Sequence, residues 1–308
     1  MAGFTTVREL GGVISTPLRN SIAKGLIIGP RIFSAGNSLA TTGGHADPTN
    51  GWAKRLMDIP NSNETIVNGV ESARRAVRQQ YKNGADHIKI TATGGVLSVA
   101  KNGQNPQFSM EELKTIIETA NDYGMHVAAH AHGDKGMQRA IIAGVRSIEH
   151  GTLMSNKTMK LMKKYGTYLV PTVSAGKWVA EKAEIDGFFP ELVRPKARKI
   201  GPMIQSTLRK AYKAGVKIAF GTDSGVSAHG ENGKEFKFMV EAGLPAMYTI
   251  KTATKFASEL LGIQETLGTI SKGKIADIIA VEQNPIKNIS TMENVVFVMK
   301  AGKIYKNN

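Results

Sequence analysis

The segment VKIAFGTDSG, Val216–Gly225, is an apolar run that ends in a polar turn flanked by glycines. The apolar run predicts a buried strand, and Asp223 follows where that strand gives way to a loop. In a parallel α/β barrel the carboxyl ends of the strands open onto one face, where catalytic groups gather. Asp223 is therefore a candidate catalytic residue.

Three other segments end in a similar way. They read HIKITATGG, HVAAHAHG and SIEHG, each an apolar strand pattern followed by glycine. Their ends carry Lys89, His130 and His150. Because each side chain is expected at or near a strand exit, we interpret all four residues as one metal site.

Strand, helix and glycine alternate over most of the chain, which is typical of a parallel α/β sheet. Strands are predicted to begin near Thr5, Arg31, His87, His126, Arg146, Tyr168 and Lys217. Helices are predicted at 17–24, 65–83, 109–123 and 155–165, in a short segment capped by Asp134, in a longer region up to 213, and over 233–261. Ser109 and Glu112 have the spacing of a capping box. Strands at 275–281 and 295–305 end the chain, the second turning at Ala301-Gly302.

The composition favours a folded protein, and a cytoplasmic location is expected because no signal peptide is visible. The chain has 308 residues, 41% of them hydrophobic, and no cysteine. No apolar run approaches the roughly 18 residues of a membrane span, and the N-terminus lacks the pattern of a signal peptide. Disulfides, zinc ribbons and a cysteine nucleophile are excluded.

The net charge of +15 raises the alternative of a nucleic-acid-binding protein. The basic residues are spread over several expected helix faces, at 157–164, 194–199 and 209–213, with few aromatic residues among them. No nucleic-acid motif accompanies them, so solvated helix faces are the favoured interpretation.

The chemistry of the four side chains suits a divalent metal. Two imidazoles, His130 and His150, and the hard oxygen of Asp223 fit Zn²⁺. If its amine reacts with CO₂, Lys89 becomes a carbamate that can bridge two ions. The metal would lower the pKa of a bound water, and Asp223 would pass the proton of that water to the leaving amine.

Taken singly, each residue has a structural alternative. A histidine at a strand end is more often a satisfied core residue, a lysine there is more often in a salt bridge, and Asp223 could cap the next segment. His126 and His132 share the face of His130 only if that strand stays regular, so they are weaker candidates.

The chain resembles the amidohydrolase superfamily, in the branch of imidazolonepropionase-like and Xaa-Pro dipeptidase-like hydrolases, over nearly its whole length. The resemblance is carried by GFTTVRELGG, GPRIFSAG, TGGHAD, HIKITATGG, HVAAHAHG, SIEHG, VPT, GTDSG, HGEN and LGTISKGKIADIIAV. It implies a (β/α)8 TIM-type barrel with one or two divalent ions. It also implies that Lys89 is carboxylated and bridging, that His130 and His150 are ligands, and that Asp223 is ligand and general base.

The resemblance also points to substrate-binding residues and to a missing segment. His45, in the long loop 36–61, and His229 match positions that face the substrate. The family's first barrel strand carries a His-x-His pair, and this chain has none before Thr5. We therefore expect an incomplete barrel without its first strand: a truncated product, a mis-assigned start, or a chain completed by a second polypeptide. A signal peptide could be lost with that segment.

The sequence predicts a metal-dependent hydrolase that cleaves the C–N bond of a small amide or dipeptide. Residues 1–262 are the expected barrel, and residues 263–308 the expected C-terminal strands of a small β-sandwich. The alternative is an inactive relative that only binds a small ligand, because the histidine pair is missing. Neither nucleic acid nor a membrane is an expected partner, and a homo-oligomer is left open.

Overall fold

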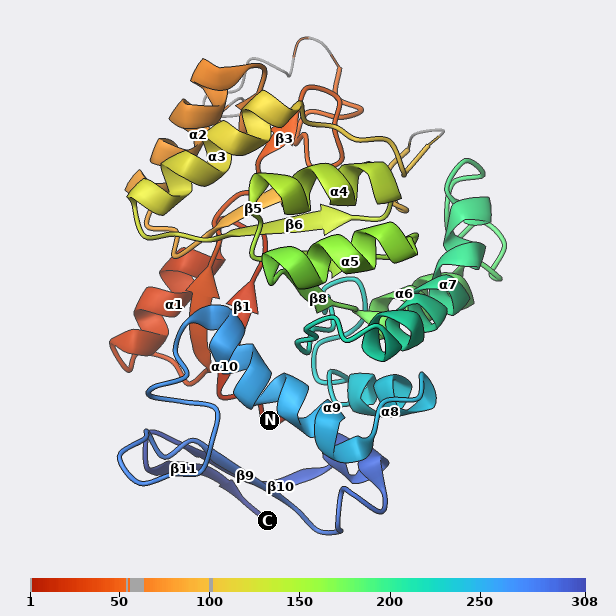
Figure 1. The fold of residues 1–308 in the computed structure, drawn as a ribbon. Helices are drawn as coiled ribbons and strands as arrows, with labels where there is room; N and C mark the ends of the chain where they lie inside the picture. Colours follow the sequence, from red (N-terminus) through yellow and green to blue (C-terminus); the bar gives the residue numbers. More distant parts are fainter. Residues whose placement is uncertain (1, 54, 56–63, 100–101) are drawn as a thin grey trace. The chain divides into compact units, whose positions relative to one another are not determined.

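The fold, shown in Figure 1, is a computed structural model that describes residues 2–53, 55, 64–99 and 102–308. The chain divides into two compact units. The N-terminal unit is Arg8–Thr167, and the C-terminal unit is Met1–Val7 with Tyr168–Asn308. Strands and helices alternate in both, which confirms the α/β class. The strand pairings of the described residues do not show a closed barrel, so the barrel and the boundary at residue 262 stay predictions.

A parallel sheet forms the centre of the N-terminal unit. Its strands are β5 (Ile88–Thr91), β6 (Val127–Ala131) and β7 (Ser147–His150). Leu39 extends the sheet through a parallel bridge to Ile90 on β5. Every residue of the three strands is buried, as expected for parallel strands covered on both faces.

Helices follow the strands and pack beside one another. They are α2 (Val70–Lys82), α3 (Met110–Asp122), α4 (Asp134–Ala143) and α5 (Asn156–Tyr165), and each packs against the next. Figure 1 shows the pairs α2–α3 and α4–α5 lying side by side. The predicted capping box is confirmed: Ser109 Oγ accepts from Glu112 N at 3.2 Å, and Glu112 Oε2 accepts from Ser109 N at 2.8 Å.

Two predictions of helix starts are wrong. The helix expected from Thr65 begins at Val70, because Ile66–Val67 forms a strand, β4, parallel to β3 (Ala40–Thr41). Gly69 has a φ of 91°, a backbone conformation that a helix cannot contain.

The second error concerns Asp134. The residue before α4 that acts as N-cap is Gly133, and Asp134 is the first helical residue. Its carboxylate accepts from Ser155 N at 2.7 Å and from Thr158 Oγ1 at 2.6 Å, so it stabilises the start of the next helix instead.

The remaining part of the N-terminal unit lies before β5. The strand β1 (Thr6–Glu9) crosses the division between the units in sequence, and β2 is Arg31–Ser34. Ala35 N donates to Glu9 O at 3.2 Å, which keeps the ends of these strands together. The helix α1 (Ser15–Ala23) lies between them in sequence.

The C-terminal unit begins with β8 (Tyr168–Val170), whose Leu169 forms a parallel bridge with Ile218. The strand predicted at Lys217 is thus reduced to this bridge. The helical region expected up to residue 213 is two helices, α6 (Val173–Lys182) and α7 (Arg194–Lys213). The segment expected at 233–261 contains α8 (Lys234–Glu241), α9 (Ala246–Ala253) and α10 (Lys255–Leu261).

An antiparallel sheet ends the chain. It contains β9 (Ile278–Val281), β10 (Val295–Lys300) and β11 (Lys303–Asn307). The predicted turn at Ala301-Gly302 is confirmed, with positive φ at both residues.

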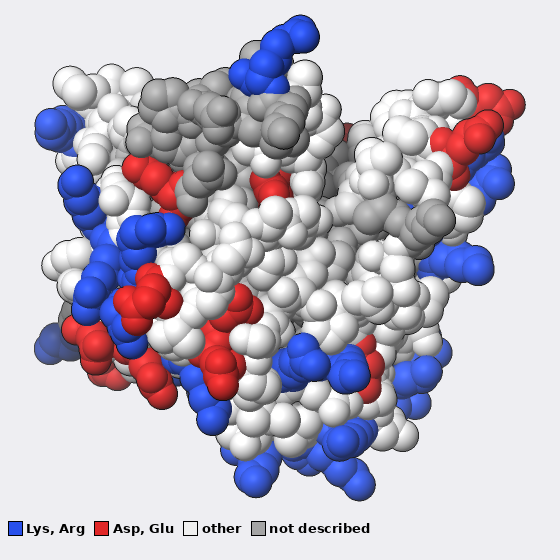
Figure 2. Space-filling view, turned by 90° about the horizontal axis from the view of Figure 1, so that it is seen from above, with Lys and Arg blue, Asp and Glu red and all other residues white. Residues whose placement is uncertain are grey.

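Charge is dispersed on the surface. On the face drawn in Figure 2, lysine and arginine side chains lie in separate groups with acidic side chains between them. None of the described helices is long and apolar enough to cross a membrane.

A buried carboxylate ties two helices of the C-terminal unit together. Glu235 on α8 accepts from Val173 N at 2.9 Å and from Ser174 N at 2.7 Å, and it also accepts from the Ser174 hydroxyl. Burial raises the pKa of Glu235 to about 7, against the opposing effect of these hydrogen bonds. Glu235 thereby takes the place of a local cap at the start of α6.

We expect Glu235 to make the protein less stable as the pH rises. Its pKa is 4.5 when unperturbed and about 7 in the fold, so between these values the folded chain binds more protons than the unfolded chain. The free energy of unfolding of the wild type, relative to Glu235→Gln, should therefore fall by roughly 3 kcal/mol from pH 4.5 to pH 8. Urea unfolding of both proteins at several pH values measures this difference in the free energy of unfolding. Glu241→Gln, at the exposed end of α8, should not show this fall.

A buried ion pair joins β1 to β7. Arg8 Nη2 lies 2.9 Å from Glu149 Oε1, with side-chain exposures of 8% and 2%, and Arg8 Nη1 donates to Ser147 Oγ at 3.0 Å. Breaking such a pair leaves a charge buried without a partner.

The change Arg8→Met should lower the free energy of unfolding by roughly 3–5 kcal/mol, because it strands the Glu149 carboxylate. The exposed pair Arg74–Glu71, at 3.0 Å, provides a matched comparison. Arg74→Met should cost less than about 1 kcal/mol. Equal losses in urea unfolding would contradict the burial argument.

Candidate metal centre

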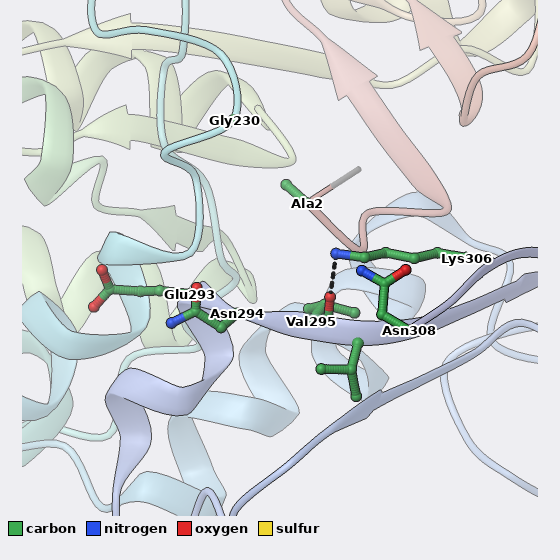
Figure 3. Close-up of a pocket in the computed structure, with 8 residues that line it drawn as sticks. Ala2, Gly230, Glu293, Asn294, Val295, Lys306 and Asn308 are labelled. Atoms are coloured by element: carbon green, nitrogen blue, oxygen red, sulfur yellow. Dashed lines mark hydrogen bonds between the residues drawn. The ribbon is translucent and has the colours of Figure 1, made fainter.

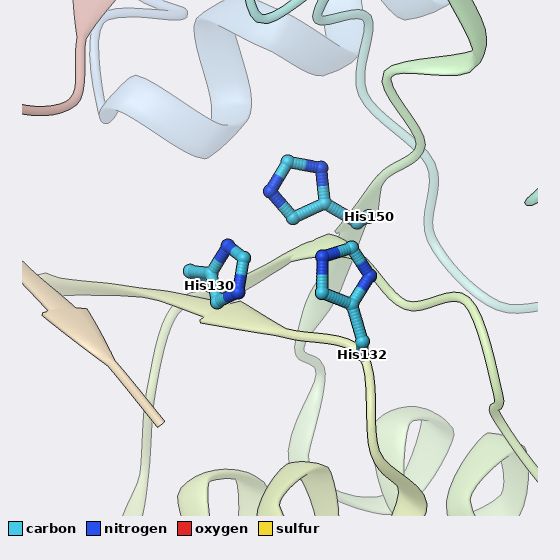
Figure 4. A group of neighbouring side chains, drawn as sticks. All are labelled: His130, His132 and His150. Carbon is cyan, nitrogen blue, oxygen red and sulfur yellow. The ribbon is translucent and has the colours of Figure 1, made fainter. Parts of the chain in front are cut away.

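Three histidines lie together at one end of the parallel sheet. Thr91 on β5 lies opposite His130 on β6, and Ala131 lies opposite His150 on β7. His132 follows β6 directly. Figure 4 shows the three imidazoles facing a common space.

The distances are those of a possible ligand cluster. One ring nitrogen from each of His130, His132 and His150 lies within 4.8 Å of the others. The ring centroids of His130 and His150 are 4.8 Å apart at 71°, and those of His132 and His150 are 4.9 Å apart at 15°. Modest side-chain rotations would converge such nitrogens on one ion, for which Zn–N bonds are about 2.0–2.1 Å.

Neighbouring groups hold two of the rings. His132 Nδ1 is 2.7 Å from Thr152 Oγ1, and His132 N donates to Thr93 Oγ1 at 3.0 Å. His130 Nε2 is 3.2 Å from Gly94 O. Such contacts orient a histidine as contacts around bound metals do.

The three imidazoles are neutral at physiological pH. Burial lowers the pKa of His132 to about 3, helped by the nearby His45. Burial, followed by the neighbouring histidines and Lys89, also holds the pKa of His130 and His150 well below the usual value. A neutral imidazole keeps the lone pair that a metal needs.

Lys89 belongs to the same group. It lies on β5, 7% exposed, close enough for its charge to depress the pKa of His130 and His150. A buried ammonium beside imidazoles is an unfavourable arrangement unless its charge is changed or balanced.

His45 also reaches the cluster. Its ring lies 4.3 Å from that of His130, measured between centroids, at 40°. Its Nδ1 is 2.6 Å from Ser98 Oγ, and its backbone N donates to Gln107 Oε1 at 3.0 Å. Gly95 makes room for the ring: a Cβ at this position would lie 2.2 Å from His45 Cε1.

The other two predicted site residues lie in the C-terminal unit. Asp223 is exposed and follows the bridge at Ile218, with a backbone φ of 53°. His229 is exposed in the loop before α8. The roles assigned to Asp223 and His229 remain predictions.

From the sequence alone His132 is a weaker candidate, but its ring lies in the cluster. The prediction that His132 shares the face of His130 required a regular strand, and β6 is regular up to Ala131. The usable signal was the alternation of His130 and His132, which places both side chains on one face.

A second concavity lies in the C-terminal unit. It has a volume of about 340 Å³, and Lys306 Nζ donates to Val295 O at 2.6 Å beside it (Figure 3). It is lined by Ala2, Gly230, Glu293, Asn294, Val295, Val296, Lys306 and Asn308. This lining includes none of the predicted site residues.

Comparison with known proteins identifies the family to which this chain belongs. The amidohydrolase family matches residues 1–305, so the chain belongs to the amidohydrolase family. A solved Xaa-Pro dipeptidase with methionine bound in its active site is 58% identical and superposes with a TM-score of 0.97. The match covers 99% of this chain and 76% of that one.

Two further relatives belong to the expected branch. Ochratoxinase of Aspergillus niger is 36% identical over 325 residues, which cover 99% of this chain. The chain spans 66% of the length of that relative. An imidazolonepropionase of Thermoanaerobacter pseudethanolicus is 31% identical over 183 residues, 57% of this chain and 38% of the relative. These matches confirm the predicted family resemblance.

Metal binding should depend on His132 and not on His126. His126 is a comparable imidazole near the start of β6, stacked on His87 at 5.2 Å, and it is not among the clustered ligands. His132→Asn should weaken Zn²⁺ binding by about tenfold or more, whereas His126→Asn should leave it unchanged. Competition with a chromophoric chelator gives both dissociation constants. Unaltered affinity in His132→Asn would exclude His132 as a ligand.

Proposed function

We propose that this protein hydrolyses the C–N bond of small amides or dipeptides with the help of a divalent metal. The observation that carries the proposal is the buried cluster of neutral imidazoles at the ends of adjacent parallel strands. Membership of the amidohydrolase family supports the reaction class. The names of the relatives suggest Xaa-Pro dipeptides and other amides as first substrates.

We propose Lys89, His130, His150 and Asp223 as the metal ligands, together with His132 of the same cluster, with Zn²⁺ as the first candidate and one or two ions bound. The imidazoles fit this role because they are buried and uncharged. A bound ion would polarise the substrate carbonyl and lower the pKa of a water molecule.

We further propose that CO₂ carboxylates Lys89. The neutral amine would form a C–N bond to CO₂ and lose a proton, which gives an anionic carbamate with two oxygen donors. The change would replace a positive charge beside His130 and His150 with a negative one, and the burial of Lys89 supports it. A carbamate also suits hard divalent ions better than an amine does.

Asp223 is the proposed general base, on the strength of the GTDSG motif and the family resemblance. Its carboxylate would take a proton from the attacking water and deliver it to the nitrogen as the C–N bond breaks. The products are a carboxylic acid and an amine. His45 and His229 are proposed to hold polar groups of the substrate, and the ring contact of His45 with His130 supports its part.

The alternative is a protein of the same family that binds a small ligand without hydrolysing it. The two functions differ in what they require. Both need the imidazole cluster, but only hydrolysis needs a proton acceptor and a stable carbamate.

The test combines metal analysis with a substrate panel. Elemental analysis should find at least one zinc-like ion per chain, and Lys89→Ala should lose most of it. Xaa-Pro dipeptides and N-acyl amino acids should be cleaved by the wild type, with kcat lowered by at least about a hundredfold in Lys89→Ala. Lys163→Ala, an exposed lysine on α5, is the matched control and should behave as wild type.

Labelled bicarbonate separates the carbamate from other roles of Lys89. A ¹³C carbamate resonance should appear in the wild type and be missing in Lys89→Ala. Metal binding without turnover on the whole panel would favour the ligand-binding alternative, and no metal in the wild type would rule out the proposed mechanism.

A further inference from the structure

The turn that carries Asp223 has an unusual backbone. Among the described residues, positive φ outside glycine occurs at His150, Thr172, Asp223 and Ala301. Asp223 has a φ of 53°. Aspartate tolerates this region better than most residues, but such a conformation persists only where the surroundings hold it.

One side chain bridges both neighbours of Asp223. Asn232 Nδ2 donates to Thr222 Oγ1 at 3.1 Å and to Ser224 Oγ at 2.8 Å. The two hydroxyls lie 3.0 Å apart, and Ser224 N donates to Thr222 Oγ1 at 3.3 Å. The amide group therefore closes a small hydrogen-bonded ring around the turn.

Asn232 is itself held in one orientation. Its Oδ1 accepts from Gly230 N at 3.1 Å, which directs the amide nitrogen toward the turn. Its backbone carbonyl accepts from Glu235 N at 3.3 Å, at the start of α8. The bridge thus connects the turn to a helix that the buried Glu235 carboxylate anchors.

The turn is closed by its own backbone as well. Val226 N donates to Asp223 O at 3.1 Å, and Gly225 N donates to Ser227 O at 2.9 Å. These bonds fix the chain after Asp223, whereas Asn232 joins the residue before it to the residue after it. The direction in which the Asp223 side chain leaves the backbone depends on both.

We propose that Asn232 is a positioning residue for Asp223, holding the Thr222–Ser224 turn so that the carboxylate has one fixed direction. The proposal rests on the proposed function, in which Asp223 moves the proton of the attacking water. Small displacements of a reacting group lower a rate steeply. Asn232 therefore contributes to turnover and little to substrate binding.

A purely structural role for Asn232 makes a different prediction. If the amide only fastens a surface loop to α8, its loss lowers stability and leaves kcat unchanged. The distinction requires variants that remove the hydrogen bonds while keeping the shape.

The experiment compares matched variants on the best substrate of the panel. Asn232→Ala and Thr222→Val each remove the same hydrogen bond, and Thr222→Ser keeps the hydroxyl. The first two should lower kcat by about tenfold or more with KM within about twofold of wild type, and Thr222→Ser should be close to wild type. The double variant should lose little more than the worse single variant, because both single variants already break the Thr222–Asn232 hydrogen bond.

Asn288→Ala provides the control. Asn288 also bridges through its amide, accepting from Ser290 N at 3.2 Å and donating to Gln283 Oε1 at 3.1 Å, on an exposed turn of the same unit. The kcat of the Asn288→Ala variant should equal that of the wild type. The proposal is overturned if Asn232→Ala keeps wild-type kcat, or if Thr222→Ser is as slow as Thr222→Val.

A crystal structure of Asn232→Ala gives a readout that does not need activity. The expected result is a negative φ at Asp223 or several conformations of the turn. If the wild type cleaves nothing on the panel, the proposed function fails, and this structure alone decides the positioning role. An Asp223 backbone unchanged from wild type would then overturn it.

Discussion

Parallel pairing of β5, β6 and β7 decides which side chains of the N-terminal unit meet. Side chains alternate between the faces of a strand, so a shift of one residue would replace His130 by Ala129 or Ala131. The register places Thr91 opposite His130 and Ala131 opposite His150. The residues of these strands are buried on both faces of the sheet. The candidate metal site therefore depends on this pairing and on the positive φ of 71° at His150, which departs from regular strand geometry.

This sheet buries an unusual amount of polar surface at both ends. One end carries the neutral histidines, near the other end His87 stacks on His126, and within β7 Glu149 pairs with Arg8. The ring of His87 is fully buried, and burial holds its pKa well below the usual value. Burial of unpaired polar groups costs stability. An apolar interior would avoid this cost, which is why the buried imidazole cluster supports the proposed metal site.

Local sequence patterns predicted the elements that depend on neighbouring residues alone. The period of apolar residues and the glycines that follow them located β5, β6, β7 and the strand-end side chains of the cluster. The errors arise where a distant group decides the outcome. Glu235 caps α6 from 62 residues away in the chain, and Asp134 supports α5 rather than its own helix. The strand at Ile66–Val67 depends on its pairing with Ala40–Thr41. No window of neighbouring residues contains these contacts.

The division of the chain also separates two requirements of the proposed chemistry. The imidazoles and Lys89 belong to the N-terminal unit, whereas Asp223 and the Asn232 bridge belong to the C-terminal unit. In the proposed mechanism the N-terminal unit supplies the imidazoles for metal binding, while proton transfer depends on the Asp223 turn, which hydroxyl and amide groups hold. A turn of this kind can change with little effect on the core. Under the proposed mechanism, a substitution in this turn would abolish turnover before it abolishes ligand binding. The two candidate functions therefore share one binding site.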